Sequence, residues 1–106
     1  MTLGPKVKAA RDEKYRRWVA SLPCCSCRIE GHSQAAHPNF GRGLGQKASD
    51  HDCFPLCAPQ PFRMGCHAMF DQLVDISRDE RRLLEVRYAA ETRELAKAAG
   101  WFREAA

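Results

Sequence analysis

The spacing of the cysteines constrains the fold of this chain more than any other feature. Cys24 and Cys27 enclose two residues, and Cys57 and Cys66 follow after a long spacer. Thiolate sulfur is a preferred ligand of zinc, and a Cys-x2-Cys turn lets two sulfurs meet one tetrahedral ion. The spacing therefore predicts a small domain folded around a structural Zn²⁺ that Cys24, Cys27, Cys57 and Cys66 hold.

Two further cysteines, Cys25 and Cys53, are left over. Free cysteine behaves as a small hydrophobic residue, so we expect both to be buried. Cys25 is also an alternative to Cys24 as the first zinc ligand. The spacing does not decide between these two neighbours.

The cellular compartment determines whether the thiols stay reduced. Lys6, Lys8 and Arg11 are not followed by the apolar segment of a secretory signal, so a cytoplasmic protein with reduced thiols is expected. A thiol redox protein built on Cys24 and Cys27 is disfavoured, because the strand–helix context of a thioredoxin-like fold is missing. Reduced thiols favour a metal site over disulfides.

The length of 106 residues is that of one domain with a modest core, which a structural metal would stabilise. No apolar run approaches the roughly 20 residues of a membrane span, so no membrane contact is expected. We therefore treat residues 1–106 as a single domain.

Periodic and capping signals predict a helix at each end of the chain. Apolar residues from Tyr15 to Leu22 recur at helical spacing and predict an N-terminal helix over residues 6–22. Ser77 and Glu80 have the spacing of a capping box and predict a C-terminal helix over residues 77–99.

Residues 23–75, between these helices, are expected to form the zinc-binding core. The turn-rich segment 24–45 suits a zinc knuckle and one strand, and residues 52–57 suit a second strand. A further helix is predicted to begin near Gly65. The fold class that follows is α+β, with a small zinc-stabilised β-hairpin core and flanking N- and C-terminal helices.

The net charge of +4 is concentrated at the N-terminus. Residues 1–17 contain six basic and two acidic residues, and the charges of the remaining chain cancel. A basic segment of this kind is typical of an arm or helix that contacts phosphate, although a solvated helix face has the same composition.

Polar residues near the cysteines form a second candidate site. His67 and Asp71 are four residues apart, so on a helix they share one face and can hold a divalent ion, although such a pair is often only a surface hydrogen bond. His37 can accept a proton from water near neutral pH, and Asn39 would lie on the same side of a strand. A histidine that satisfies a loop carbonyl is the alternative.

Several pieces of this pattern occur together, in the same order, in a known class of enzyme. Residues 24–71 resemble an HNH endonuclease of the ββα-metal or treble-clef type, and more narrowly the small phage and prophage nucleases related to the recombination-enhancing Ref protein. The matching pieces are Leu22-Pro23-Cys24-Cys25-Ser26-Cys27, Ala36-His37, Gly43-Leu44-Gly45-Gln46-Lys47-Ala48-Ser49-Asp50, Pro55-Leu56-Cys57 and Cys66-His67 with Asp71.

The resemblance implies metal-dependent cleavage of DNA phosphodiester bonds with little sequence preference. It makes His37 the general base, with Asn39 or Asp50 orienting it or completing the metal shell. It gives His67 and Asp71 a catalytic Mg²⁺ or Mn²⁺, with Zn²⁺ or Ni²⁺ as alternatives. The predicted phosphate contacts are Lys6, Lys8, Arg11, Lys14, Arg42 and Lys47.

The partners expected on this basis are duplex or branched DNA and phage recombination or replication proteins. A second copy of the chain is a further candidate, because the C-terminal helix carries Leu83 and Leu84. The competing hypothesis is a non-catalytic zinc module that binds DNA or protein. It retains the cysteines and the basic segment and treats His37 and Asp71 as structural residues.

Overall fold

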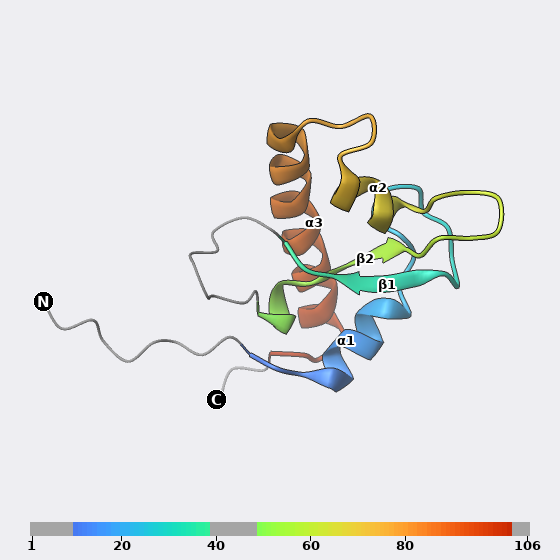
Figure 1. The fold of residues 1–106 in the computed structure, drawn as a ribbon. Helices are drawn as coiled ribbons and strands as arrows, with labels where there is room; N and C mark the ends of the chain where they lie inside the picture. The colour runs from blue at the N-terminus through green and yellow to red at the C-terminus, as the bar shows by residue number, and fades with distance from the viewer. Residues whose placement is uncertain (1–9, 39–48, 103–106) are drawn as a thin grey trace, which may run out of the picture.

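The computed structural model describes residues 10–38 and 49–102 of the chain. The elements in chain order are α1 (Glu13–Ala20), β1 (Ser33–Ala36), the 3₁₀ turn η1 (Asp50–Asp52), β2 (Phe54–Cys57), α2 (Cys66–Gln72) and α3 (Arg78–Ala98). The protein is therefore a small α+β fold, as predicted, with two strands and three α-helices in the described residues (Figure 1).

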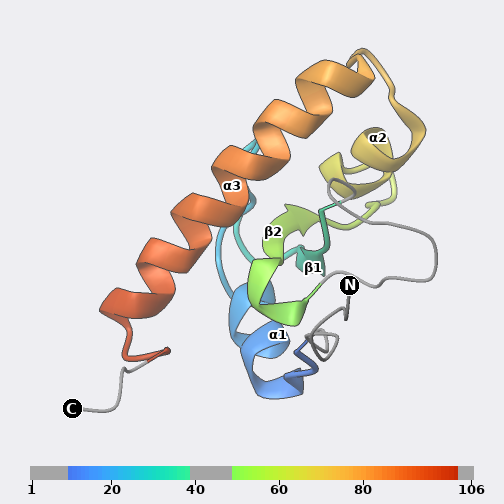
Figure 2. The ribbon, with the colours of Figure 1, turned by 90° about the vertical axis from the view of Figure 1, so that its left-hand side faces the viewer.

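The two strands pair antiparallel at the centre of the fold. Ser33 lies opposite Cys57 at one end of the ladder, and Ala36 lies opposite Phe54 at the other. Helix α1 lies on one side of this hairpin and α2 on the other (Figure 1). Helix α3 runs the length of the molecule beside both (Figure 2).

The sheet separates two hydrophobic clusters, because neighbouring strand residues point to opposite faces. One cluster is built on Ala36 and Phe54 and receives Phe70 from α2 and Tyr88 from α3. The other is built from α1, Cys53 and the end of α3, and Ala35 packs against it from β1. Three of the cysteines predicted as zinc ligands, Cys24, Cys57 and Cys66, belong to the first cluster, whereas Cys27 is exposed.

Helix α1 is shorter than the helix predicted over residues 6–22. It begins at Glu13 because the side chain of Asp12 accepts a hydrogen bond from the N–H of Tyr15 and caps the helix. Residues 10–12 precede the helix, and residues 1–9 lie outside the described residues. The predicted buried face is present, with Tyr15 and Val19 fully covered.

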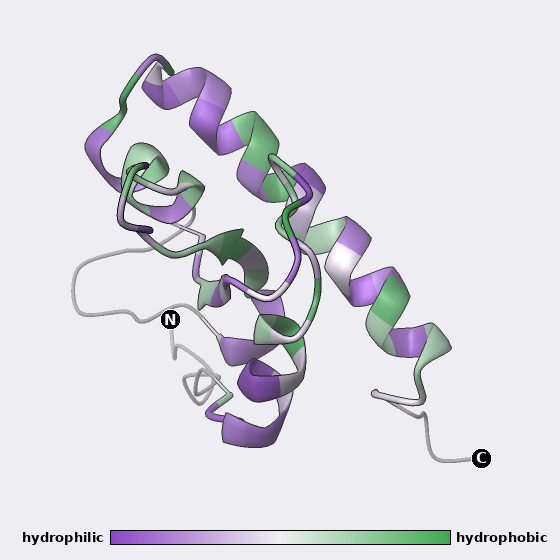
Figure 3. Ribbon diagram, turned by 90° about the vertical axis from the view of Figure 1, so that its right-hand side faces the viewer, coloured by the Kyte–Doolittle hydropathy of each residue, from purple (hydrophilic) through white to green (hydrophobic). Residues whose placement is uncertain are grey.

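The two later helices begin where they were predicted to begin. Helix α2 starts at Cys66, directly after Gly65, and α3 starts after Ser77 with both bonds of the capping box to Glu80 formed. Hydrophilic and hydrophobic residues alternate in short bands along α3 (Figure 3), and no helix of the described residues is long and apolar enough to cross a bilayer. Of the two leucines predicted to be available for pairing, Leu84 packs on the core and only Leu83 is exposed.

Candidate functional site

The four cysteines predicted as zinc ligands lie together. Their sulfur atoms are all within 4.8 Å of one another, and the group contains Cys24, Cys27, Cys57 and Cys66. The Sγ atoms of Cys27 and Cys57 are 3.7 Å apart, close to the distance of about 3.8 Å that tetrahedral Zn–S bonds of about 2.3 Å require. All six cysteines of the chain are free thiols. This cluster can hold a structural metal such as zinc.

Three segments of the chain position the four candidate ligands. Cys24 and Cys27 belong to the knuckle after α1, Cys57 ends β2, and Cys66 begins α2. Backbone N–H groups point at the sulfurs: those of Ser26 and Cys27 lie 3.4 and 3.5 Å from Cys24 Sγ, and that of Cys66 lies 3.2 Å from Cys57 Sγ. Such donors stabilise thiolates, the form that binds metal.

The thiols of the metal-free cluster differ in acidity. Burial acts to raise the pKa of Cys27, but hydrogen bonds from the Ile29 N–H and the Arg63 guanidinium outweigh it and lower the pKa to about 6. Burial raises the pKa of Cys66 to about 12. Binding of a metal must therefore displace thiol protons.

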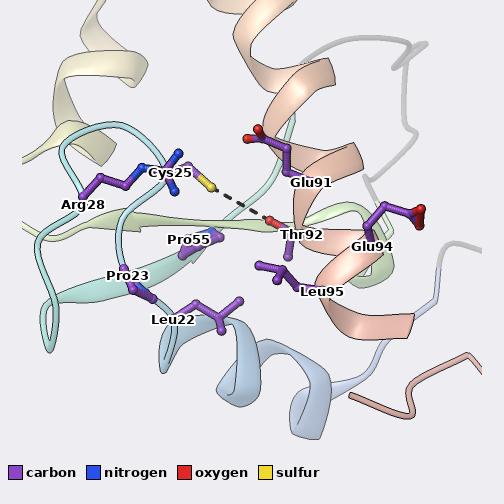
Figure 4. Close-up of a pocket in the computed structure, with 9 residues that line it drawn as sticks. All are labelled: Leu22, Pro23, Cys25, Arg28, Pro55, Glu91, Thr92, Glu94 and Leu95. Carbon is purple, nitrogen blue, oxygen red and sulfur yellow. Dashed lines mark hydrogen bonds between the residues drawn. The ribbon is translucent and has the colours of Figure 1, made fainter. Parts of the chain in front are cut away.

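Cys25 points away from the cluster. Its Sγ lies 3.9 Å from Thr92 Oγ1 on α3, where both residues line a cavity of about 570 Å³ (Figure 4). Burial raises the pKa of the Cys25 thiol to about 11. Cys24, not Cys25, thus completes the four-sulfur group, and Cys53 is buried in the cluster around α1.

His37 and Asp50, two of the three predicted catalytic residues, are in contact. His37 Nε2 lies 2.8 Å from Asp50 Oδ1, so the ring N–H donates to the carboxylate. A neutral ring in this tautomer keeps a lone pair on Nδ1. The side chain of His37 is 33% exposed, whereas that of Asp50 is only 3% exposed. The third predicted residue, Asn39, lies outside the described residues.

The Asp50 carboxylate also binds the start of α1. It accepts the Asp12 N–H at 2.7 Å and Arg16 Nε at 3.0 Å, and Arg11 lies 3.5 Å away. Burial alone would raise the pKa of Asp50, but the bonds from Asp12 and His37 and the charge of Arg16 outweigh it and lower the pKa. Asp50 is therefore a charged carboxylate that joins η1, α1 and His37.

A second histidine–carboxylate pair adjoins the first. His51 Nε2 lies 3.0 Å from Asp12 Oδ2, and the ring of His51 packs edge-on against Tyr15 and Phe102. The hydrogen bond from His51 is the main reason that the pKa of Asp12 is lowered. Because Asp12 also caps α1, this pair fixes the beginning of the helix that carries Arg16.

The predicted divalent-metal pair lies on α2. His67 Nε2 is 3.9 Å from Asp71 Oδ2, and His67 Nδ1 is 2.8 Å from Gln34 Oε1 on β1. Donation from Nδ1 to the glutamine oxygen leaves the Nε2 lone pair directed toward Asp71. This is the outer-shell support that metal-binding histidines generally have. The pair offers two ligand atoms.

His37 and His67 lie on different sides of the hairpin. His37 and Ala35 line a cavity of about 280 Å³ with Arg16 and Arg17 of α1, whereas His67 bonds to Gln34. Residues 34 and 35 alternate in direction along β1. Within residues 10–38 and 49–102, no hydrogen bond or ion pair joins His37 to His67 or Asp71. The structure thus forms two polar sites where the sequence suggested one.

The predicted phosphate contacts are only partly described. Lys14 is exposed on α1, and Arg11 is half-exposed beside Asp50. Lys6, Lys8, Arg42 and Lys47 lie outside the described residues. Arg16 and Arg17, counted in the sequence only as part of the charge surplus, line the same cavity as His37, together with Glu13.

A family model described as "Protein of unknown function (DUF968)" matches residues 1–73. The chain belongs to this family. No curated protein and no solved structure matches the chain. The DUF968 match spans α1 through α2 and therefore contains the cysteine cluster and all three histidine–carboxylate pairs.

The parts of this DUF968 protein that sequence reasoning missed are long-range partners. Asp12 and His51 are 39 residues apart, and Cys25 and Thr92 are 67 apart. Asp12 carries one usable signal, because an aspartate before a helix is a preferred N-cap. His51 next to Asp50 carries none that distinguishes it from a surface histidine.

Proposed function

We propose that this DUF968 protein is a zinc-stabilised, metal-dependent endonuclease that hydrolyses DNA phosphodiester bonds with low sequence specificity. The observation that supports it most is the 2.8 Å contact between His37 and the buried carboxylate of Asp50. A histidine whose ring is oriented by a buried acid is the usual arrangement of a general base, and Nδ1 of His37 has no hydrogen-bond partner among residues 10–38 and 49–102. The order of two antiparallel strands followed by α2 is also that of a ββα-metal nuclease core.

Positive charge next to the base suits a phosphodiester substrate. Arg16 and Arg17 share the cavity that His37 lines, and their side chains are 44% and 76% exposed. Arg16 pairs with Asp50 and Arg17 pairs with Glu13 of the same cavity, so a phosphate has to compete with these carboxylates. Guanidinium groups bind phosphate oxygens in a bidentate manner. They would place the scissile phosphate within reach of a water molecule held by His37.

In the proposed reaction, His37 Nδ1 takes a proton from water while the water oxygen attacks phosphorus. The bond between phosphorus and the 3′ oxygen breaks, and solvent protonates the departing oxygen. Asp50 stabilises the imidazolium that forms, because its carboxylate accepts a hydrogen bond from the Nε2–H group. His67 and Asp71 would hold Mg²⁺ or Mn²⁺, which when bound supplies charge stabilisation to a phosphate.

Because the two polar sites lie on different sides of the hairpin, the DNA strand has to pass the end of the sheet to contact both. The end formed by Ala36 and Phe54 carries His37 as the next residue. A DNA strand that passes along α1 and around this end of the sheet would contact the basic residues of α1.

One observation favours the alternative, a zinc module that binds DNA without cleaving it. The buried carboxylate of Asp50 accepts hydrogen bonds from Arg16 and from the N–H of Asp12. These bonds explain its burial without any catalytic role. On this hypothesis His37 only donates one more hydrogen bond to the Asp50 carboxylate.

Nicking of supercoiled plasmid by the zinc-loaded protein separates the two hypotheses. With Mg²⁺ or Mn²⁺ added, wild type should nick the plasmid, and His37→Ala should reduce the rate by about 10²- to 10⁴-fold, the usual contribution of a general base. His32→Ala, at an exposed histidine, is the matched control. If wild type binds the plasmid but does not nick it, the nuclease hypothesis is rejected in favour of the zinc module that only binds DNA.

A further inference from the structure

The eight residues between the last two cysteines of the metal cluster form a separate small hairpin. The N–H of Gln60 donates to the carbonyl of Arg63 at 2.9 Å, and the N–H of Arg63 donates back to Gln60 at 3.2 Å. These two bonds close a tight turn with Pro61 and Phe62 at its tip. Proline at the first central position favours a turn, because its φ is already fixed.

The base of this hairpin is held rigidly. The N–H of Ala58 donates to the backbone carbonyl of His32 at 2.8 Å, and the side-chain amide of Gln60 donates to the Ala58 carbonyl at 3.1 Å. Gly65 packs so closely on Ala58 that an added Cβ would lie 2.5 Å from the Ala58 carbonyl oxygen. Both ends then continue into metal-cluster cysteines. The tip has little freedom to fold back onto the protein.

The hairpin presents one large aromatic side chain to solvent. Phe62 is 101% exposed, more than any other large hydrophobic residue of the described chain. Its neighbour Arg63 points the other way, since its guanidinium donates a hydrogen bond to Cys27. Scattered exposed hydrophobic residues are ordinary, but this one stands at the tip of a braced turn, where the backbone prevents its burial.

We propose that Phe62 is a stacking platform for an unpaired nucleobase, so that the preferred substrate is DNA with single-stranded or branched segments. This inference rests on the proposed function. An aromatic face stacks on any base without reading its identity, in keeping with low sequence specificity. In duplex DNA the bases are already stacked on one another, so the platform has no free base to receive.

The hairpin leaves the sheet after Cys57, at the end opposite Ala36 and His37. It leads directly into α2, whose second residue is His67. A DNA strand with a base stacked on Phe62 has to run along the hairpin toward α2 to reach the His67 and Asp71 pair.

A protein partner fits the tip less well. Stable protein interfaces bury about 800 Å² on each partner, whereas the turn offers a single large hydrophobic side chain. The net positive charge of the chain also favours an anionic polymer.

The test measures binding of the zinc-loaded full-length protein without added Mg²⁺ or Mn²⁺, to a labelled oligo(dT) single strand and to a duplex. Phe62→Ala should raise the Kd for the single strand by about tenfold, the effect of losing one stacked base. Phe62→Trp should restore it, and the duplex Kd should change by less than about twofold. Leu83→Ala, at another exposed hydrophobic residue, is the control and should change neither Kd.

Equal losses on single strand and duplex, an unchanged single-strand Kd in Phe62→Ala, or no single-strand binding by wild type would each overturn the proposal. So would a change in the sedimentation coefficient of the free protein on Phe62→Ala, which would assign Phe62 to contact between copies. If Phe62 contributes to single-strand binding but wild type does not nick plasmid, the nuclease proposal is rejected and the stacking role of Phe62 is retained. If wild type nicks plasmid and Phe62→Ala cleaves a single-stranded or branched substrate as fast as wild type, only the stacking role of Phe62 is excluded.

Discussion

His37 and Asp50 are joined by a 2.8 Å hydrogen bond across the segment that separates the two strands, and Asp50 is the buried partner. The same carboxylate accepts bonds from Arg16 and from the backbone of Asp12. One acidic side chain therefore orients the proposed base and attaches α1 to η1. Changes at Asp50 should affect activity and stability together.

Replacing Asp50 by Asn should lower the free energy of unfolding by about 1–3 kcal/mol, because an amide cannot accept all the bonds that the buried carboxylate accepts. Urea denaturation of the zinc-loaded protein measures the change. Asp52→Asn is the control, since its carboxylate is 49% exposed and pairs with Arg93 at the surface. Equal stability of the two variants would show that the Asp50 hub contributes nothing beyond a surface ion pair.

The hydrogen bonds to the Asp50 carboxylate also determine how the stability of the protein depends on pH. The pKa of Asp50 is below its ordinary value of 3.8 in the folded protein, so folding favours the ionised form. Its contribution to stability is complete above the unfolded pKa and is lost as the pH falls through the lower folded pKa. Unfolding free energies measured on both sides of pH 3.8 should fall toward acid, and the fall should be smaller in Asp50→Asn. Parallel curves for the two proteins would exclude this contribution.

Loss of the cluster metal should unfold the protein. Structural zinc in small modules contributes about 10–16 kcal/mol of binding free energy, more than a domain of this size can replace. Cys24→Ser should abolish stoichiometric zinc binding and the thermal transition, whereas Cys25→Ser should keep both, because Cys25 lies beside Thr92. Zinc content by elemental analysis and thermal unfolding measure the two effects. Zinc loss in Cys25→Ser alone would reverse the assignment.

Gln34 should matter for a divalent ion at His67. Its side-chain oxygen lies 2.8 Å from His67 Nδ1 and fixes the ring with Nε2 toward Asp71. Loss of such an outer-shell partner generally weakens metal binding by about 10–100-fold. Mn²⁺ titration followed by electron paramagnetic resonance should show this loss in Gln34→Ala and a larger one in Asp71→Ala.

Asp75→Asn, at an exposed acidic residue four positions after Asp71, is the control for that titration. If wild type binds no Mn²⁺, or if Asp71→Ala binds it as tightly as wild type, the pair is only a surface contact between a histidine and a carboxylate.

Two glycines with similar φ angles should respond differently to alanine. Gly65 has φ +85° and no room for a Cβ, whereas Gly31 has φ +82° and nothing within 4 Å of that position. Gly31→Ala should cost about 1 kcal/mol from the left-handed conformation alone, and Gly65→Ala about 3 kcal/mol or more. Chemical denaturation compares them, and equal losses would mean that the hairpin base is not tightly packed.

The sequence by itself determined the local features of this protein. The start of α3 follows from Ser77 and Glu80, because a capping box is made within one helical turn. The start of α2 after Gly65 and the choice of β2 were also predictable, since each depends on nearby residues. The four cysteines were recognisable because zinc ligation restricts residue type and spacing strongly.

Tertiary structure alone decided which distant side chains meet. Cys24 and Cys25 are neighbours with the same chemistry, and only the packing of α3, which brings Thr92 to Cys25, separates their roles. The start of α1 at Glu13 depends on Asp12, whose carboxylate is held by His51 from another element. Likewise, the direction of His37 toward α1 and of Gln34 toward His67 follows from strand register. A burial preference or a charge count cannot specify such partners, because these contacts form only when the chain has folded.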